Sequence, residues 1–217
     1  GNISEATKYY QYFISQGFKD HRVFSNYGII LQGLTKLKEA EIYTRKAIEL
    51  NPDFAEAHNN LGNILRDLGN LQDAELSTRK AIELNPDFAE AHLNLGNILE
   101  DLGNFDDAIN QYKQSLKLNN QLSLAKTALI ATKGLICDWS DEETYNIWLQ
   151  SLGIKGTSIW PSTLFSIEDN PLRHLKRSKN FYKERFKRPT KYIKYSKKNI
   201  IHIGYFSADF RTHPVMQ

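Results

Sequence analysis

The sequence contains very little cysteine and no long apolar run. Cys137 is the single cysteine among 217 residues, so the chain cannot form an intramolecular disulfide or a metal site built from several cysteines. No apolar stretch is long enough to span a bilayer, and we expect no secretory signal. The length allows one to two domains, and the composition is that of an ordinary soluble protein. A reducing, cytoplasmic location fits these features best.

Charge is divided unevenly along the chain. Residues 1–122 carry 12 Lys and Arg against 17 Asp and Glu, whereas residues 123–217 carry 16 against 8. The most basic stretch, residues 170–198, contains 12 Lys and Arg, one Glu and several aromatic residues. Such a mixture can bind nucleic acid, but a solvated helix followed by a basic linker is the more common arrangement. We find no base-reading motif, and a nucleic-acid scaffold stays an alternative only.

A 34-residue pattern recurs through the first half of the chain. The fifteen residues Thr44–His58 recur unchanged as Thr78–His92. Apolar residues in each unit form two stripes at helical spacing, which predicts two helices per unit. Small residues also recur every 34 positions, and they predict that the two helices cross closely. These residues are Gly28, Gly62 and Gly96 in the first helix and Ala40, Ala74 and Ala108 in the second.

The predicted helix ends follow from turn and capping residues. Asp53 and Glu56 have the spacing of a capping box at the start of a first helix. Gly69 can end that helix, and Asn70 can cap the next one. Pro86 separates this unit from the one that follows.

These landmarks resemble the tetratricopeptide repeat. Leu61, Gly62, Ala74, Ala81 and Pro86 stand at the offsets typical of that repeat. The resemblance implies a mainly α solenoid with a concave surface that binds other proteins. We divide the chain into a partial repeat with its second helix only at 1–20, repeats at 21–54, 55–88 and 89–122, a capping helix at 123–136, a helical, basic linker at 137–198, and the start of another domain at 199–217. Because residues 1–20 match only a second helix, we expect further repeats upstream.

Asparagines recur in register inside the first helices. Asn26, Asn60 and Asn94 lie 34 residues apart, although asparagine is less favourable than alanine in a helix by roughly 0.7 kcal/mol. Asn63 and Asn97 lie three residues later and share that face. A row of amides has donors and acceptors that can hold the backbone of an extended peptide. The alternative is that these side chains only bond neighbouring helices, and helical spacing does not separate the two interpretations.

The chain changes character after Cys137. Helices are predicted at about 141–152 and 170–186, and the apolar run at 199–207 predicts a buried strand. The loop that follows the strand contains His213. A strand, a loop and a helix start are typical of the opening of an α/β domain, whose ligands bind at the carboxyl ends of strands.

A second resemblance covers nearly the whole chain. CDWSD at 137–141, the Trp160-Pro161 and Asp169–Leu172 segments, and above all IGYFSADFRTHP at 203–214 resemble the protein O-linked N-acetylglucosamine transferases and their SPINDLY-type relatives. In that family a repeat superhelix leads through a helical linker into two Rossmann-like lobes. The resemblance therefore implies that residues 199–207 form the first strand of an α/β glycosyltransferase domain.

The same resemblance implies an activity and its residues. His213 matches an active-site histidine that has been considered as a general base, and Asn26, Asn60 and Asn94 match the family's asparagine ladder, which holds the acceptor protein. The implied reaction transfers N-acetylglucosamine from UDP-N-acetylglucosamine to Ser or Thr, with no cofactor and no metal. Some SPINDLY-type members transfer fucose instead. We expect the 217 residues alone to be inactive, because no nucleotide-binding loop is present, and the alternative function is a non-catalytic adaptor.

Overall fold

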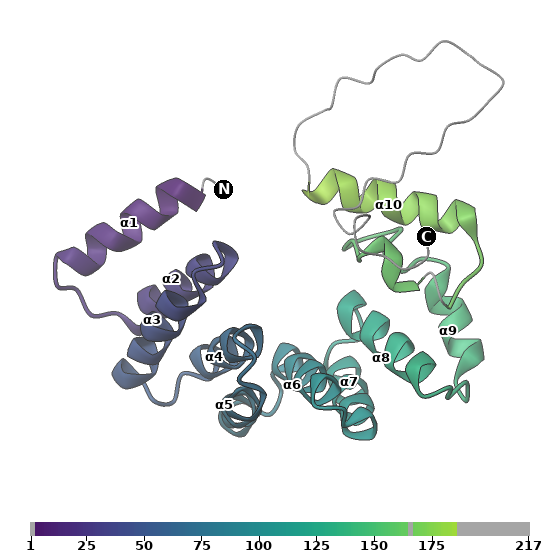
Figure 1. Cartoon of the computed structure of the whole chain (residues 1–217), viewed down its shortest axis with the longest axis horizontal. Coiled ribbons are helices and arrows are strands. Elements are labelled where there is room, and N and C mark those ends of the chain that lie inside the picture. Colours follow the sequence, from purple (N-terminus) through teal and green to yellow (C-terminus); the bar gives the residue numbers. More distant parts are fainter. Residues whose placement is uncertain (1–2, 165–166, 186–217) are drawn as a thin grey trace, which may run out of the picture. The chain divides into compact units, whose positions relative to one another are not determined.

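The computed structural model describes residues 3–164 and 167–185 of the chain (Figure 1). These residues are helical and include no strand, as expected for a solenoid of helical repeats. The predicted strand at 199–207 and His213 lie outside the described residues. The helices are α1 (Ile3–Ser15), α2 (His21–Gly33), α3 (Leu37–Leu50), α4 (Ala55–Asp67), α5 (Leu71–Leu84), α6 (Ala89–Asp101), α7 (Phe105–Leu118), α8 (Ser123–Leu135), α9 (Glu142–Leu149), a 3-10 turn (Pro161–Leu164) and α10 (Pro171–Arg185).

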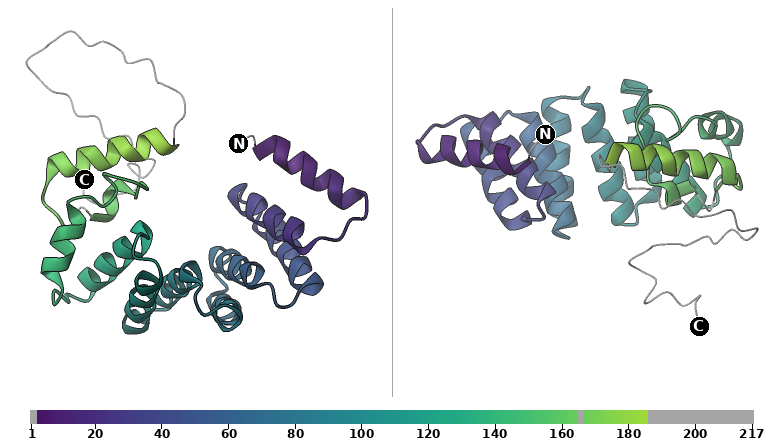
Figure 2. Two further views of the ribbon diagram at one scale, coloured as in Figure 1. Left: turned by 180° about the vertical axis from the view of Figure 1, so that it is seen from behind. Right: turned by 90° about the horizontal axis from the view of Figure 1, so that it is seen from above.

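Three helical hairpins form the repeats, namely α2 with α3, α4 with α5 and α6 with α7. In the second and third hairpins the first helix packs against both helices of the preceding hairpin, and α8 packs in the same way on α6 and α7. The first helices α2, α4, α6 and α8 therefore contact one another in sequence and form one layer (Figures 1 and 2).

The hydrophobic core is shared between neighbouring repeats. Ile98 of α6 packs with Leu61 and Leu65 of the preceding hairpin. One repeat earlier, Ile64 of α4 packs with Tyr27 and Leu31 of α2. Each hairpin thus buries its apolar residues against the next one, which is the usual source of stability in a solenoid.

A glycine in each first helix lies against the second helix of its own hairpin. A Cβ atom at Gly62 would lie 2.0 Å from Thr78 Oγ1 and 3.2 Å from the carbonyl oxygen of Ala74. In the third hairpin, a Cβ atom at Gly96 would lie 2.4 Å from the ring of Tyr112. The close helix crossing predicted from the small residues is therefore confirmed.

The carboxyl end of α4 has the predicted glycine stop. Gly69 has a φ of 81°, and its N–H donates to the carbonyl of Arg66 over 2.9 Å. The N–H of Asn70 donates to the carbonyl of Leu65, also over 2.9 Å, which completes a Schellman motif.

The predicted capping box at the start of α4 is wrong. The N-cap is Phe54, and no side chain accepts a capping hydrogen bond there. Asp53 stands one residue before the N-cap, a position from which its carboxylate does not cap the helix. Asn70 does occupy the N-cap of α5, but its side chain makes no capping hydrogen bond either.

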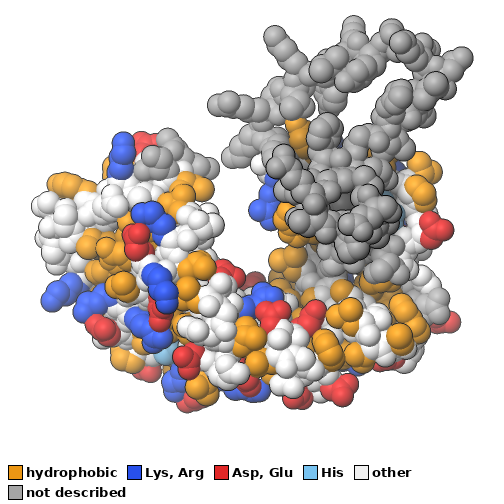
Figure 3. Space-filling view, viewed as in Figure 1, with side chains coloured by type: hydrophobic (Ala, Val, Ile, Leu, Met, Phe, Trp, Pro, Cys, Tyr) orange, Lys and Arg blue, Asp and Glu red, His pale blue; other side chains and the backbone are white. Residues whose placement is uncertain are grey.

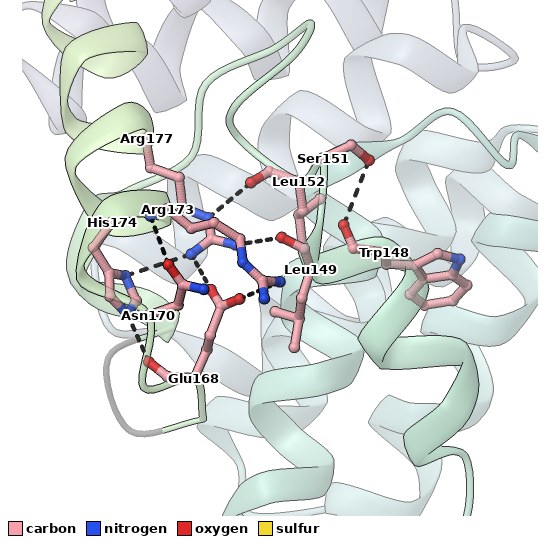
Figure 4. A network of polar contacts seen from close by, with 9 residues as sticks. All are labelled: Trp148, Leu149, Ser151, Leu152, Glu168, Asn170, Arg173, His174 and Arg177. Atoms are coloured by element: carbon pink, nitrogen blue, oxygen red, sulfur yellow. Dashed lines mark hydrogen bonds and ion pairs between the residues drawn. The ribbon is translucent and has the colours of Figure 1, made fainter.

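The two helices predicted after Cys137 are α9 and α10, and a buried arginine connects α10 to α9 and the segment after it (Figure 4). Arg177 is completely buried and donates to the carbonyl oxygens of Leu149 and Leu152 over 2.6 and 2.9 Å. Its guanidinium also pairs with the buried carboxylate of Glu168. Arg173 meets the other oxygen of that carboxylate at 2.6 Å.

Candidate peptide-binding face

The predicted asparagines share one stripe of the first-helix layer. We call it the first-helix stripe, and it contains the residues at the same four positions in α2, α4 and α6. The two outer positions are exposed in every repeat, and in α4 and α6 the two inner positions are half-buried. The residues are Arg22, Asn26, Ile29, Gly33, Glu56, Asn60, Asn63, Asp67, Glu90, Asn94, Asn97 and Asp101.

Asn60 and Asn94 each bond to the preceding repeat. The Nδ2 atom of Asn60 donates to Ser25 Oγ over 3.0 Å, and the Nδ2 atom of Asn94 donates to Asn59 Oδ1 over 2.9 Å. Both bonds join residues 35 positions apart. The interhelical interpretation therefore accounts for one amide hydrogen of each side chain. Among the described residues, none donates a hydrogen bond to the Oδ1 atom of Asn60 or Asn94.

The other three asparagines differ from this pattern. Asn26 is exposed, and Asn63 is half-buried without a side-chain hydrogen bond to any described residue. The Oδ1 atom of Asn97 accepts a hydrogen bond of 3.1 Å from Tyr112 of its own hairpin. The stripe thus presents amides at all five predicted positions, but the groups that remain open to a ligand differ from repeat to repeat.

Ion pairs and amide contacts also join the carboxyl ends of successive first helices. Gln32 Nε2 donates to Asp67 Oδ2 over 2.6 Å, and Arg66 Nε donates to Asp101 Oδ2 over 2.5 Å. Burial lowers the pKa of Arg66, but the hydrogen bond and charge of Asp101 outweigh that effect, so the pKa is raised overall. These contacts again span 35 residues, so they repeat the offset of the asparagine bonds.

Glu100 of α6 occupies the position that Arg66 has in α4 and Gln32 has in α2. Its Oε2 atom accepts hydrogen bonds from the hydroxyl groups of Tyr112 and Thr132, over 2.7 and 2.8 Å. Burial raises the pKa of the Tyr112 phenol, and the carboxylate of Glu100 raises it further. The Glu100 carboxylate therefore joins α6, α7 and α8.

The first-helix layer is acidic in its middle. Helices α4 and α6 contain five carboxylates and one guanidinium, that of Arg66. Figure 3 shows charged and apolar side chains side by side on the surface of the repeats. An acidic face attracts cationic partners and repels anionic ones, whereas a neutral partner meets no repulsion. The carboxylates are Glu56, Asp67, Glu90, Glu100 and Asp101.

Two buried cations, Lys133 and Arg177, were not recognised in the sequence. Lys133 of α8 is 2% exposed and pairs with Asp138 at 2.9 Å and Asp141 at 2.6 Å. Burial lowers the pKa of this ammonium, but its hydrogen bonds to Asp141 and Asp138 outweigh that effect and raise the pKa overall. The nearby acidic residues in CDWSD were the available signal for Lys133. Arg177 gave no comparable signal, since it lies in an evenly basic stretch.

The described residues provide no metal site and no spanning helix. Within residues 3–164 and 167–185, no cluster of three or more His, Cys, Asp or Glu side chains is arranged to hold a metal ion. The helices in these ranges are also too short or too polar to cross a bilayer.

The repeats match known family models in sequence. Residues 21–54, 55–88 and 89–121 each match a tetratricopeptide repeat. No curated protein matches the chain. The chain therefore contains three tetratricopeptide repeats, which indicate a surface for protein–protein interaction.

Solved structures with the same fold agree with this assignment. A crystal structure of MamA is 17% identical and covers 84% of this chain and 92% of its own, with a TM-score of 0.59. MamA from Desulfovibrio magneticus RS-1 is 18% identical over 73% of this chain and 89% of its own, with a TM-score of 0.62. The first repeat domain of Spaghetti (RPAP3), bound to the HSP90 peptide SRMEEVD, is 19% identical over 54% and 94%, with a TM-score of 0.52. At these identities the likeness shows the fold alone.

Proposed function

We propose that the three repeats bind an extended polypeptide along the first-helix stripe. The observation that carries the proposal is the repeated geometry of Asn60 and Asn94. Each uses an amide hydrogen to bond the preceding repeat, and each keeps its carbonyl oxygen free of hydrogen bonds from described residues. An oxygen held in this way can accept a backbone N–H of a peptide without selecting its side chains.

We further propose that this polypeptide is the acceptor of a protein O-glycosyltransferase. The support is the resemblance of CDWSD and IGYFSADFRTHP to the O-linked N-acetylglucosamine transferases and SPINDLY-type proteins. UDP-N-acetylglucosamine is the implied donor, His213 the implied active-site histidine, and a cytoplasmic location suits that donor. We expect no sugar transfer by the isolated chain, and turnover of UDP-N-acetylglucosamine by these 217 residues alone would contradict this expectation.

A non-catalytic adaptor is the second candidate. The repeat domain of Spaghetti, which shares the fold, was solved with the peptide SRMEEVD, so this scaffold can bind a peptide. Because α4 and α6 carry five carboxylates, we expect this acidic peptide to bind poorly here. Reading the coding DNA beyond Gln217 distinguishes the candidates, since two catalytic lobes require a few hundred further residues with alternating strands and helices.

Mutations that separate the two roles of Asn60 test the peptide proposal. Asn60→Ala removes both the bond to Ser25 and the free oxygen, whereas Ser25→Ala removes only the bond. We expect Asn60→Ala, combined with Asn94→Ala, to weaken binding of a neutral extended peptide in fluorescence polarisation. Ser25→Ala should leave that affinity unchanged. If the native chain, the Asn60→Ala with Asn94→Ala variant and Ser25→Ala bind the peptide with equal affinity, the asparagines have a purely structural role.

A further inference from the structure

We propose that α8 provides an apolar subsite for an aliphatic side chain of the polypeptide bound along the first-helix stripe. This inference rests on the proposed function above. The subsite consists of the four residues of α8 at the positions of the stripe, which are Leu124, Ala128, Ala131 and Leu135. They follow Glu90, Asn94, Asn97 and Asp101 of α6 by 34 residues each.

The pattern of exposure continues from the repeats into α8. Leu124 is 54% exposed and Leu135 is 65% exposed, while Ala128 and Ala131 between them are half-buried. The outer positions of the stripe are likewise exposed in α4 and α6, where they carry Glu or Asp. The face that is polar and acidic on two helices therefore becomes apolar on the next one.

The other faces of α8 already have partners. Ala125 and Leu129 pack with α6 and α7, and Ile130 packs with Tyr145 and Leu149 of α9. Ala128 also touches the core of α6 and α7, so Leu124 and Leu135 are the stripe residues of α8 that these helices leave exposed. The two exposed leucines continue the stripe of the repeats and can contact a ligand that is bound along it.

The charge of the stripe on α4 and α6 determines which peptides can bind there. A peptide that crosses α4 and α6 meets carboxylates and amides, so its residues there should be polar and neutral or cationic. When the same peptide reaches α8, the stripe positions carry leucine and alanine side chains. The fitting ligand is therefore an extended, neutral or cationic polypeptide with one aliphatic side chain at the end that lies over α8.

Paired peptides test this inference on the whole chain. The probes are fluorescein-labelled peptides of Gly, Ser and Lys that carry one Leu near either the amino or the carboxyl terminus, and matched peptides with Ser in place of Leu. We expect one of the Leu peptides to bind about tenfold more tightly than its Ser counterpart, because burying part of one leucine side chain gives roughly that gain.

Two double variants locate the effect. Leu124→Ser with Leu135→Ser should reduce the preference for the Leu peptide to about twofold or less. Both leucines are more than half exposed, so the fold should persist, and circular dichroism checks this. The matched control is Ile42→Ser with Leu76→Ser, which removes two apolar side chains of 65% and 68% exposure from second helices. This control should keep the tenfold preference.

The possible outcomes distinguish the inference from the proposed function. If no peptide binds the native chain, the proposed peptide-binding function fails, and the subsite fails with it. If Leu and Ser peptides bind equally tightly, the function stands and the subsite is overturned. The subsite is also overturned if the control variant loses the preference, or if the native chain dimerises in sedimentation experiments and Leu124→Ser with Leu135→Ser makes it monomeric.

Discussion

At the residue scale, the three repeats provide internal comparisons at equivalent positions. Thr35 has a φ of 61°, and the equivalent residues of the next two repeats are Gly69 and Gly103, each with a φ of 81°. A β-branched residue is strained in this left-handed conformation, at a cost of about 1–3 kcal/mol, whereas glycine adopts it freely. The first repeat therefore carries a local strain that the other two avoid.

We predict that Thr35→Gly stabilises the protein. The released strain should exceed the entropy lost by glycine on folding, so the free energy of unfolding should rise by about 1 kcal/mol. Urea denaturation followed by circular dichroism measures the change. The reciprocal variant Gly69→Thr should lower the free energy by a similar amount, and a destabilised Thr35→Gly protein would contradict the prediction.

Two glycines with different surroundings give a second prediction. A Cβ atom at Gly62 would overlap Thr78 Oγ1 and press on the carbonyl of Ala74, so Gly62→Ala should force the hairpin apart and cost at least 2 kcal/mol. Ala74→Leu on the facing helix should cost about 1–3 kcal/mol for the same reason. The control is Gly33→Ala, since no atom beyond its chain neighbours and the backbone of its own helix lies within 4 Å of the added methyl group. This change should be neutral or slightly stabilising in thermal denaturation.

At the element scale, the buried Arg177 of α10 bonds to α9 and to the segment after it. Arg177→Ala would leave Oε2 of Glu168 and two backbone carbonyls without their donor, and such losses cost about 3–5 kcal/mol. We predict that this variant releases α10 while the repeats stay folded. Limited proteolysis should then cut within residues 171–185 much faster than in the native chain. Arg173→Ala is the control, because its half-buried side chain reaches only the second oxygen of Glu168. Equal cleavage of both variants would contradict the role given to Arg177.

The junction between α8 and α9 should respond to acid. Hydrogen bonds to Lys133 lower the pKa of Asp138 and Asp141 below the ordinary value of 3.8. Carboxylates with a lowered folded-state pKa stabilise the fold above their unfolded pKa, and this stabilisation is lost as the pH falls below about 4. We therefore predict that the fluorescence of Trp148, next to this junction, changes in that range. Lys133→Met should remove the pH dependence, and an unchanged titration in that variant would contradict the assignment.

At the scale of the whole molecule, the described repeats pack mainly against their neighbours along the chain. Helix α1 packs substantially on α2 alone, and it exposes Tyr9 and Tyr12. Local opening is easiest where few contacts are buried. We predict that amide hydrogens exchange fastest in α1 and slowest in α4 and α6, which have neighbours on both sides. Uniform exchange across these helices would show that the repeats unfold as one cooperative unit.

Much of this architecture could be predicted because the same landmark residues recur in three successive repeats. The helix pairs, their close crossing at Gly62 and the stop at Gly69 all follow from residues that recur in phase. The capping box failed because Asp53 has the right spacing but lies one residue before the N-cap, Phe54. The hydrogen-bond partners of Asn60 and Asn94 could not be predicted, because the 35-residue offset depends on the register in which neighbouring first helices pack.

Arg177 could not be predicted either. Its partners include the carbonyl oxygens of Leu149 and Leu152, which any residue can supply and no sequence pattern marks. The roles of the stripe asparagines in peptide binding and of His213 in catalysis stay predictions.

Because the segments Thr44–His58 and Thr78–His92 are identical, the number of repeats could change during evolution. Recombination between their coding sequences would delete one complete repeat and leave the reading frame and the junction unchanged. Asn94 would then meet Ser25, as Asn60 does now, and Asp101 would meet Gln32 in place of Asp67. Both new pairs are chemically equivalent to existing ones, so a descendant could shorten or lengthen its array in a single genetic event and still fold. The length of polypeptide that such a protein can bind would then change in steps of one repeat.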